Sequence, residues 1–548
     1  METIADIIRR HAQIAPDSPA FVDAGQVPLT YQALSDLIDR VQMRLNAMGF
    51  GRGDRIATVG PNDAATAALV TGVMGCAAVV PTNPGLSVGE LAIYLRDQKV
   101  RAVAIDTATD SPVRMVAGEL GLPLLEVERI DNGVTGLIDI RPGTSVGKTR
   151  RPGRTQADDL GMVLLTSGTT SHSKVVPITH GQLLTRIARL AGAFGLTATD
   201  RCLNLMPLFH AHGLHAALGS TLYAGGSIVM LPEFSTAAFY LRLKTMALTW
   251  YTGSYTFHHR IHAAAPDHAA IVKNARLRFL RAASGQLDAK IASELETIFR
   301  VPVIQTYSST ELSCVCCTPF PPAVRKPGTV GLSAGAEIGI MDADNRLLPA
   351  GERGEVVVRS GDIFSGYEND PAANAQCLVD GWFRTGDEGV FDEDGYLTLT
   401  GRIKDIINRG GEKITPSEVD DALMDHPDVT DAVTFPIPHA TLGQEVAAAV
   451  IPAKGTDLTD ETLAHFLRGR LAPFKVPRRF VIVDKIPTGH TGKVSRQRLN
   501  EAFGLVTDAA TRRERVEDDR PATPLETRLQ KLWAEILGLD RVGLNEDF

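Results

Sequence analysis

The sequence predicts an α/β protein built from more than one domain. At 548 residues the chain exceeds the length at which a single core normally stops growing. Short β-branched runs alternate with longer stretches of helical periodicity, which is typical of layered α/β domains with parallel sheet. The runs are residues 101–106, 175–179, 226–231 and 301–309, and the helical stretches include 236–247 and 288–299.

The pattern changes from about Gly328. Glycines and Asp/Asn turns there separate short strands without helices between them, which predicts a β-rich subdomain. A second mixed unit follows, and we place the domain boundary near Arg402. Its expected helices are residues 417–426 and 460–471, and its expected strands are 429–437 and 445–453. We therefore expect a first domain over residues 1–401 and a second over 402–505.

The end of the sequence has a different character. Residues 506–522 are dense in mixed charge and read as an exposed linker. Residues 523–548 begin with a capping box, Thr523 with Glu526, and place apolar residues on one helical face. One such helix is poorly stable alone, so we expect either that this sequence belongs to a longer chain or that the helix docks elsewhere.

Composition favours catalysis on a small molecule. The chain is 44% apolar and 22% charged, and its net charge of -8 gives no electrostatic reason to expect nucleic acid or an anionic membrane as partner. We see neither a signal peptide nor a membrane span; residues 64–80 read as a buried helix and strand, and the cytoplasm is the expected location. Cys314, Cys316 and Cys317 could suggest a metal, but without a second ligand pair buried free thiols are the favoured reading.

The stretch "LLTSGTTSHSK", residues 164–174, looks like a phosphate loop. It is not a P-loop, because Val175 stands where Ser or Thr would bind Mg²⁺ and Gly168 does not directly precede Lys174. What remains is a mobile polar loop after an apolar strand, able to clamp a polyphosphate. An ordinary surface turn is the alternative.

Three further stretches follow the loop in order: "TYSSTEL" (306–312), residues 381–420, and "IPTGHTGKVSR" (486–496). Together they resemble the adenylate-forming superfamily of acyl-CoA synthetases, luciferase-like ligases and nonribosomal peptide synthetase adenylation domains, over residues 1–505. The resemblance implies a large N-terminal domain of stacked α/β subdomains with a β-rich one, and a small mobile α+β C-terminal domain. It also implies a ligase reaction in which Mg-ATP and a carboxylate give acyl-AMP and pyrophosphate, and a thiol then takes the acyl group.

The resemblance implies a role for each matching residue. The β- and γ-phosphates would be held by Thr166, Ser167, Gly168, Thr169, Thr170 and Lys174. Thr310 would contact phosphate, and Glu311 would be the Mg²⁺ ligand unless it is a structural carboxylate. The loop departs from the family pattern SGTTGxPKG, since Ser171, Ser173 and Val175 replace Gly, Pro and Gly, so we expect a stiffer clamp at Ser171.

Nucleoside contacts are implied in the same way. Tyr307, which could otherwise be a core residue, would frame the adenine together with the backbone around Ser284, Gly285 and Gln286. Asp387 would accept hydrogen bonds from the ribose hydroxyls. Arg402 would assist at the ribose and Lys404 would be the hinge, or both could be surface charges.

The two half-reactions would use opposite faces of the C-terminal domain. Lys493 would bridge the substrate carboxylate and the α-phosphate during adenylation; a solvated lysine is the alternative. Rotation of the domain would then bring Gly410, Gly411 and Lys413 to the site and open a channel for the thiol.

His210 lies where amino-acid-activating relatives place an aspartate, so a non-amino acid, small or aromatic, is the expected substrate. His210 would close the carboxylate end of the acyl pocket, or be a packed core histidine. The other expected pocket residues are Tyr255, His258, Ser308, Ser309 and Cys314. These segments are most similar to oxalate and coumarate CoA ligases.

Residues 523–548 resemble the start of an acyl carrier domain, cut before its phosphopantetheine serine. We therefore expect acyl transfer to the phosphopantetheine thiol of a fused carrier, with a stand-alone ligase that uses free CoA as the alternative. A luciferase-like oxygenase would share every motif and is the third possibility. A catalytically inactive binding module is disfavoured, because Lys493, Glu311 and Asp387 are all retained.

Overall fold

The structure is a computed structural model. It describes residues 2–141, 146–166, 174–285, 287–487 and 494–505, together with residues 523, 525, 527–529 and 531. Within these ranges no helix is both long and apolar enough to cross a bilayer.

The first sheet has a parallel centre and antiparallel edges. Its strand order is β7–β6–β5–β3–β4–β8–β9, with parallel pairing from β6 to β8 and antiparallel pairing of β7 with β6 and of β9 with β8. The strands are β3 (Arg55–Val59), β4 (Ala78–Thr82), β5 (Ala102–Asp106), β6 (Leu124–Arg129), β7 (Ile138–Ile140), β8 (Leu160–Thr166) and β9 (Lys174–Thr179). The predicted parallel sheet is thus confirmed at its centre, while its edges are hairpins that the alternation of strands and helices did not predict.

Helices cover both faces of this sheet because successive strand residues point to opposite sides. Ile56 and Val79 pack with α1 (Ile4–Ile14), α2 (Tyr31–Ala47) and α3 (Ala64–Met74). Ala57 and Val80 pack with α4 (Val88–Asp97) and α5 (Val113–Glu119) on the other face. Helix α3 is buried nearly all round, as expected for an apolar stretch inside a protein, so residues 64–80 are a buried helix and strand.

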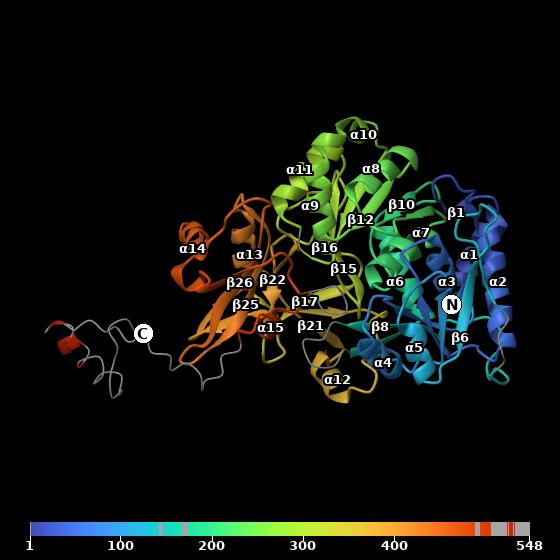
Figure 1. Ribbon diagram of the computed structural model, residues 1–548, viewed down its shortest axis with the longest axis horizontal. Coiled ribbons are helices and arrows are strands. Elements are labelled where there is room, and N and C mark those ends of the chain that lie inside the picture. Colours follow the sequence, from blue (N-terminus) through green and yellow to red (C-terminus); the bar gives the residue numbers. More distant parts are fainter. Residues whose placement is uncertain are drawn as a thin grey trace.

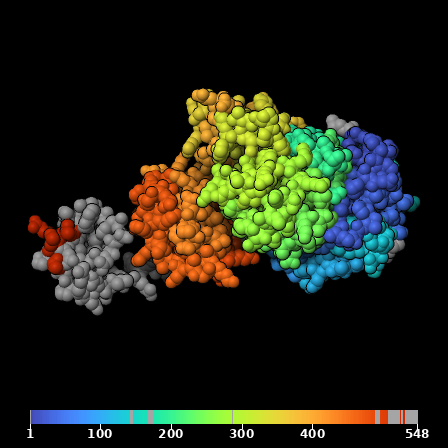
Figure 2. All heavy atoms as spheres, turned by 90° about the horizontal axis from the view of Figure 1, so that it is seen from above, coloured from blue at the N-terminus to red at the C-terminus, as the bar shows by residue number. Residues whose placement is uncertain are grey.

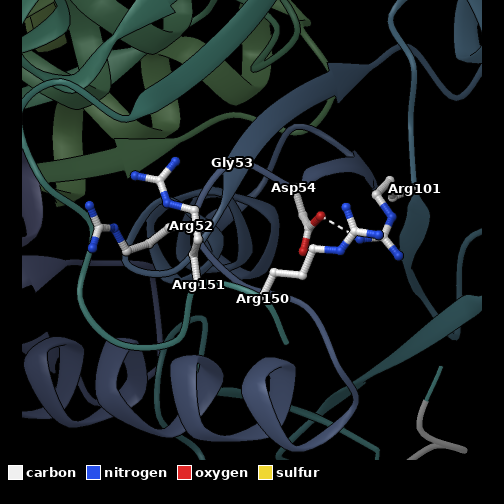
Figure 3. Close-up of a pocket in the computed structure, with 6 residues that line it drawn as sticks. All are labelled: Arg52, Gly53, Asp54, Arg101, Arg150 and Arg151. Carbon is white, nitrogen blue, oxygen red and sulfur yellow. Dashed lines mark hydrogen bonds and ion pairs between the residues drawn. The ribbon is translucent and has the colours of Figure 1, made fainter. Parts of the chain in front are cut away.

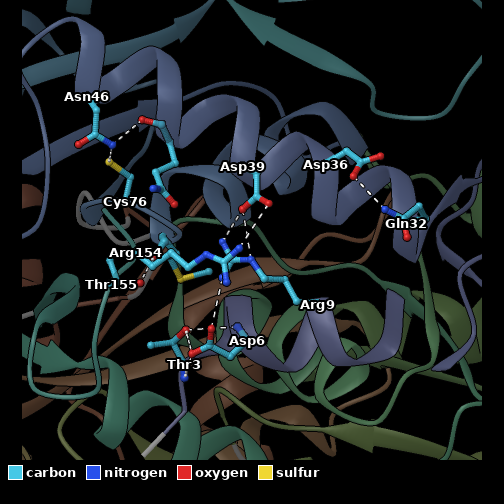
Figure 4. Close-up of polar contacts among 12 residues, drawn as sticks. Thr3, Asp6, Arg9, Gln32, Asp36, Asp39, Asn46, Cys76, Arg154 and Thr155 are labelled. Atoms are coloured by element: carbon cyan, nitrogen blue, oxygen red, sulfur yellow. Dashed lines mark hydrogen bonds and ion pairs between the residues drawn. The ribbon is translucent and has the colours of Figure 1, made fainter. Parts of the chain in front are cut away.

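Polar contacts fix the helices that close the outside of this layer (Figure 4). Thr3 and Asp6 form a capping box at the start of α1. Arg9 on α1 donates to Asp39 on α2 at 2.7 Å and to Asp6 at 3.3 Å. The Arg9–Asp39 ion pair links α1 to α2 beside their packed apolar faces.

The second sheet lies beside the first, in the order β16–β15–β14–β13–β12–β10–β11–β1–β2. Its strands are β1 (Pro19–Phe21), β2 (Leu29–Thr30), β10 (Arg201–Asn204), β11 (Ser227–Met230), β12 (Trp250–Gly253), β13 (Phe279–Ala282), β14 (Val303–Ser309), β15 (Ser313–Cys317) and β16 (Leu332–Ser333). One face packs on α6 (His180–Ala193), the π-helix η1 (His212–Gly219) and α7 (Ser220–Tyr223). The opposite face packs on α8 (Thr236–Thr245), α9 (Tyr255–Ala264), η2 (Pro266–His268), α10 (Ala269–Lys273) and α11 (Ala289–Phe299).

The expected β-rich unit is a mainly antiparallel sheet in the order β18–β17–β19–β21–β20, with β22 paired to β21. Its strands are β17 (Glu337–Met341), β18 (Leu347–Leu348), β19 (Gly354–Arg359), β20 (Leu378–Val379), β21 (Trp382–Phe391) and β22 (Leu397–Arg402). One short helix, α12 (Pro371–Cys377), interrupts it and was not expected; it starts with proline at its first position, capped by Asp370.

The C-terminal unit begins after the short 3₁₀ turn η3 (Ile403–Asp405). Its sheet runs β24–β23–β26–β25, with β27 beside β26. The elements are β23 (Ile407–Arg409), β24 (Glu412–Ile414), α13 (Pro416–Met424), β25 (Val429–His439), β26 (Gly443–Pro452), α14 (Asp460–Arg468), η4 (Pro473–Lys475), β27 (Arg479–Ile482) and α15 (Arg496–Ala502). The chain changes sheets between β22 and β23, which supports a boundary near Arg402.

The C-terminal unit lies beside the α9–α11 layer and the β-rich sheet in both views (Figures 1 and 2). The charge of Asp431 on β25 acts on Tyr255 at the start of α9, and the charge of Asp288 at the start of α11 acts on Asp421 on α13. These two pairs show that β25 lies near α9 and that α13 lies near α11. Beyond residue 505 the structure describes few positions; Leu525 and Leu529 are helical there and exposed.

Cys314, Cys316 and Cys317 are free and buried, as expected for core thiols. Burial raises the pKa of Cys314 to about 11. The described residues contain no group of three or more His, Cys, Asp or Glu side chains placed to hold a metal ion.

Candidate active site

The predicted site residues gather at the carboxyl edge of the second sheet. Strands β10, β12, β13 and β14 are parallel neighbours, so the segments that follow them meet at one edge. His210 follows β10, Tyr255 follows β12, Ser284 follows β13 and Thr310 follows β14. This is the edge at which open α/β sheets bind their ligands.

Thr310 and Glu311 form the turn between β14 and β15, and a buried arginine fixes this turn. Arg186 on α6 is fully buried and donates to the carbonyl oxygens of Thr310, at 3.0 Å, and of Glu311. It also donates to the Asp362 carbonyl oxygen at 3.0 Å. Desolvation lowers the pKa of Arg186 to about 10, which still leaves it charged near neutral pH. No pattern in the sequence singled out this residue, because an arginine on an amphipathic helix is usually exposed.

Glu311 is connected to the phosphate loop through one tyrosine. The Tyr367 hydroxyl donates to Glu311 Oε1 at 2.7 Å, and Lys174 Nζ lies 4.6 Å from the centre of the Tyr367 ring. Thr166 and Lys174 are paired across the β8–β9 hairpin, so they hold the two ends of the loop together. Burial raises the pKa of Tyr367 well above its ordinary value, and the nearby Glu311 charge adds to this, so Tyr367 remains a donor.

Asp387 on β21 is held by two donors. The Tyr307 hydroxyl donates to Asp387 Oδ2 at 2.6 Å, and Arg402 Nε donates to Oδ1 at 3.0 Å. Asp387 is 8% exposed, whereas the Arg402 side chain is 53% exposed. The structure therefore brings three of the predicted nucleoside-binding residues into one cluster.

A polar chain that the sequence did not single out lies beside this cluster. His212 Nδ1 is 2.8 Å from Ser284 Oγ, and His212 Nε2 is 2.6 Å from Thr252 Oγ1. Arg281 donates to Thr252 Oγ1 at 3.0 Å and to Thr306 Oγ1 at 2.7 Å. His212 follows His210 by two residues in "FHAHG", and this pair of histidines is the sequence feature that could have pointed to His212.

The expected acyl-pocket residues divide into two groups. His210, Tyr255 and Ser309 are half-buried and Ser308 is exposed, all at the carboxyl edge. His258 and Cys314 do not face an opening, because both are fully buried. His258 bonds to the Arg281 carbonyl oxygen at 3.1 Å and contacts the Tyr251 hydroxyl at 3.3 Å, so it packs under the sheet edge. Desolvation lowers the pKa of His258 to about 4.

Other predicted residues lie apart from these clusters or outside the described residues. Gly410, Gly411 and Lys413 are exposed at the β23–β24 turn, and Lys404 is exposed in η3. The residues outside the described ranges are Ser167, Gly168, Thr169, Thr170, Gln286 and Lys493. Arg496, just beyond Lys493, contacts Asp420 at 2.6 Å and acts electrostatically on Tyr255.

A basic cavity of about 550 Å³ lies elsewhere (Figure 3). Its lining residues are Arg52, Gly53, Asp54, Arg101, Arg150 and Arg151. Arg52, Gly53 and Asp54 directly precede β3 and Arg101 precedes β5, so the cavity opens at the amino edge of the first sheet, opposite Thr166 at the end of β8. It is not the predicted site.

A Mg²⁺ ion fits the chemistry of Glu311. Tyr367 occupies one carboxylate oxygen, which leaves the other for a hard cation. The described residues contain no group of three or more His, Cys, Asp or Glu side chains that could hold a metal ion without other ligands. Mg²⁺ bound to a nucleotide commonly takes one or two carboxylates and completes its shell with phosphate oxygens and water.

Comparison with known proteins shows the family of this chain. The family model described as AMP-binding enzyme matches residues 8–368, and that of the AMP-binding enzyme C-terminal domain matches residues 418–493. The oxalate–CoA ligase of Arabidopsis thaliana is 35% identical over 92% of this chain and 99% of its own length. The sulfoacetate–CoA ligase of Cupriavidus necator is 32% identical over 91% and 97%.

A solved structure agrees as well. The ATP-bound MatB of Rhodopseudomonas palustris superposes with a TM-score of 0.80 at 27% identity, over 91% of this chain and 99% of that one. It shares the large N-terminal domain and the small C-terminal domain. The chain therefore belongs to the AMP-binding, adenylate-forming enzyme family and is an AMP-forming acid–thiol ligase.

Proposed function

We propose that this protein activates a small, non-amino carboxylic acid with Mg-ATP as an acyl-adenylate and then transfers the acyl group to CoA. The observation that carries the proposal is the pair of clusters at one sheet edge: Glu311 with Tyr367 and Lys174, and Asp387 with Tyr307 and Arg402. One cluster suits phosphates and a metal ion, and the other suits a ribose.

In the first half-reaction, the acid carboxylate attacks the α-phosphorus and pyrophosphate leaves. Lys174, Thr166 and the loop between them hold the β- and γ-phosphates. Glu311 would contribute an oxygen to Mg²⁺, which would neutralise phosphate charge when bound, and Thr310 contacts phosphate. Asp387 accepts from the ribose hydroxyls, while Tyr307 and the backbone of Ser284, Gly285 and Gln286 frame the adenine. Lys493 bridges the two reacting anions.

The acid is small and lacks an α-amino group. An ammonium group would need a carboxylate near His210, and the sequence has none in residues 206–214. The relatives named for oxalate and sulfoacetate act on small acids that carry a second anionic group. We therefore propose a compact, polar acid, with an aromatic acid as the alternative; His210, Tyr255, Ser308 and Ser309 line its pocket.

The arrangement of domains supports the first half-reaction. Arg496 and Asp431 act electrostatically on Tyr255, so α15 and β25 of the C-terminal unit lie near the start of α9 in the large domain. Gly410, Gly411 and Lys413 are exposed. We propose that rotation about Lys404 brings these exposed residues to the site and admits the thiol.

Free CoA is the proposed acceptor. The relatives named above are CoA ligases that the chain covers almost completely, whereas the carrier reading depends only on residues 523–548. Mass spectrometry can distinguish the two acceptors, CoA and the carrier. Oxalate, sulfoacetate, ferulate and glycine are each incubated with CoA or with a longer chain that bears a phosphopantetheinylated carrier. Acyl-CoA from a small acid but not from glycine is expected. Faster acylation of the carrier than of CoA would restore the carrier as acceptor.

A further inference from the structure

Arg281 is a buried cation that has no carboxylate partner within the described part of the chain. It is 1% exposed, lies 5.3 Å over the Phe194 ring, and donates only to two threonine hydroxyls, while its Nε atom has no partner among the described residues. Desolvation lowers its pKa to about 10, so it remains charged near neutral pH. Burying an unneutralised charge is costly, which makes a structural role alone a poor explanation.

The donor and acceptor capacities of these side chains determine the direction of the hydrogen-bond chain that starts at Arg281. A guanidinium only donates, so Thr252 Oγ1 accepts from Arg281 at 3.0 Å. Among the described residues the other polar partner of this hydroxyl is His212 Nε2 at 2.6 Å, and the hydroxyl proton must go there to be satisfied. His212 Nε2 is then an acceptor, so Nδ1 carries the ring proton and donates to Ser284 Oγ at 2.8 Å.

Ser284 is the exposed end of this chain. Its hydroxyl oxygen already accepts from His212, so its own proton is available for a ligand. The backbone of Ser284 has a φ of 65°, a left-handed conformation that is uncommon for serine and occurs at ligand sites. Every bond therefore points from the buried cation outward, and such aligned donors reinforce one another.

We propose that Arg281 is a positioning residue for the acid substrate: acting through Thr252 and His212, it sets Ser284 as a hydrogen-bond donor to an anionic oxygen of the acid. That the ligand is the acid substrate rests on the proposed function, whereas the direction of the hydrogen-bond chain does not. An anion at Ser284 also provides the negative charge that Arg281 lacks among the described residues.

Two isosteric substitutions separate this role from a merely structural one. Thr252→Val and Thr306→Val each remove one hydroxyl partner of Arg281, but only Thr252→Val interrupts the path to Ser284. We expect Thr252→Val to raise the KM for the acid about tenfold, the effect of one lost bond to a charged group, and to leave the KM for ATP unchanged. Ser284→Ala should raise the acid KM similarly, and the double variant should add little. Thr306→Val should leave the acid KM near that of the parent.

Nitrogen-15 NMR of histidine-labelled protein tests the chain without any substrate, with His212→Gln to assign the signal. The parent and Thr306→Val should show His212 protonated at Nδ1, and Thr252→Val should lose this preference. An Nε2-protonated His212 in the parent, or equal acid KM values for the two threonine variants, would overturn the proposal. If no acid is activated at all, the proposed function fails, but the NMR result still decides the direction of the hydrogen bonds between Arg281 and Ser284.

Discussion

At the scale of single residues, the hydrogen bond from Tyr307 to Asp387 decides how well the Asp387 carboxylate is oriented toward the ribose. Tyr307→Phe removes the donor to Asp387 Oδ2 and leaves Arg402 on the other oxygen. We expect the KM for ATP to rise about tenfold, since a hydrogen bond to a charged group is lost. Steady-state kinetics with varied ATP measure this.

Tyr396→Phe is the matched control for that substitution. Its hydroxyl also donates, but to the Val324 carbonyl oxygen away from the site. It should destabilise the fold slightly and leave the KM for ATP unchanged. Equal shifts in both variants would show that Asp387 does not depend on Tyr307.

A buried histidine makes folding sensitive to acid. His215 is fully buried, both ring nitrogens lack partners among the described residues, and desolvation lowers its pKa to about 3. Below its ordinary value of about 6.5 the unfolded chain binds a proton that the folded chain does not, so stability falls as pH falls. His215→Leu should reduce this loss by about 1.4 kcal/mol per pH unit between pH 6 and 4.

Urea denaturation at several pH values checks this prediction. His465→Gln, at an exposed position of α14, is the control and should not change the dependence. An unchanged pH dependence in His215→Leu would contradict the account of this buried ring.

The site residues that a motif singled out stay predictions, but several of them lie together in the structure. The sequence pointed to Glu311, Asp387, Tyr307 and Arg402, and the structure brings the last three into direct contact. It could not show that His258 is buried, because a histidine on a partly buried helix can face either side. It also missed His212 and Arg281, whose roles depend on contacts between strands far apart in sequence.

At the scale of elements, the turn after β13 depends on one glycine. A Cβ atom on Gly285 would lie 2.4 Å from Cδ1 of Tyr255, so Gly285→Ala must displace the ring at the start of α9. We expect kcat/KM for the acid to fall by at least about tenfold, since small misplacements at a site are costly. Coupled kinetics with varied acid measure the effect.

Gly192→Ala on α6 is the control, because nothing lies within 4 Å of the added Cβ. It should leave kcat/KM unchanged and stabilise the helix slightly. Full activity in Gly285→Ala would show that Tyr255 does not line the acid pocket.

Most helices and strands were predictable because their periodicity is local. The expected strand 301–309 is β14 (Val303–Ser309), and the expected helix 460–471 contains α14 (Asp460–Arg468). Pairing direction was not predictable in the same way: β9 is the antiparallel partner of β8, although the centre of the same sheet is parallel. Strand direction depends on connection geometry, which a period of two residues does not encode.

At the scale of the whole molecule, the proposed hinge can be tested with one proline. Lys404 is the second residue of a 3₁₀ turn, where the backbone N–H has no partner within the turn, so proline fits the present conformation and fixes φ. We expect Lys404→Pro to retain acyl-adenylate formation and to slow acyl transfer to CoA by about tenfold or more.

Quenched-flow measurement of both half-reactions distinguishes the outcomes. Lys404→Ala removes the charge without fixing the backbone and should keep both rates. Equal slowing of both half-reactions by Lys404→Pro would indicate that the turn acts on folding and not as a hinge.

The central claim is that this site activates a carboxylic acid through acyl-AMP. Acid-dependent exchange of labelled pyrophosphate into ATP, measured across a panel of small and aromatic acids, tests it most directly. The account predicts exchange with at least one small non-amino acid, and a loss of about 100-fold or more in Glu311→Gln and Lys493→Ala. No exchange with any acid, or undiminished exchange in both variants, would contradict it.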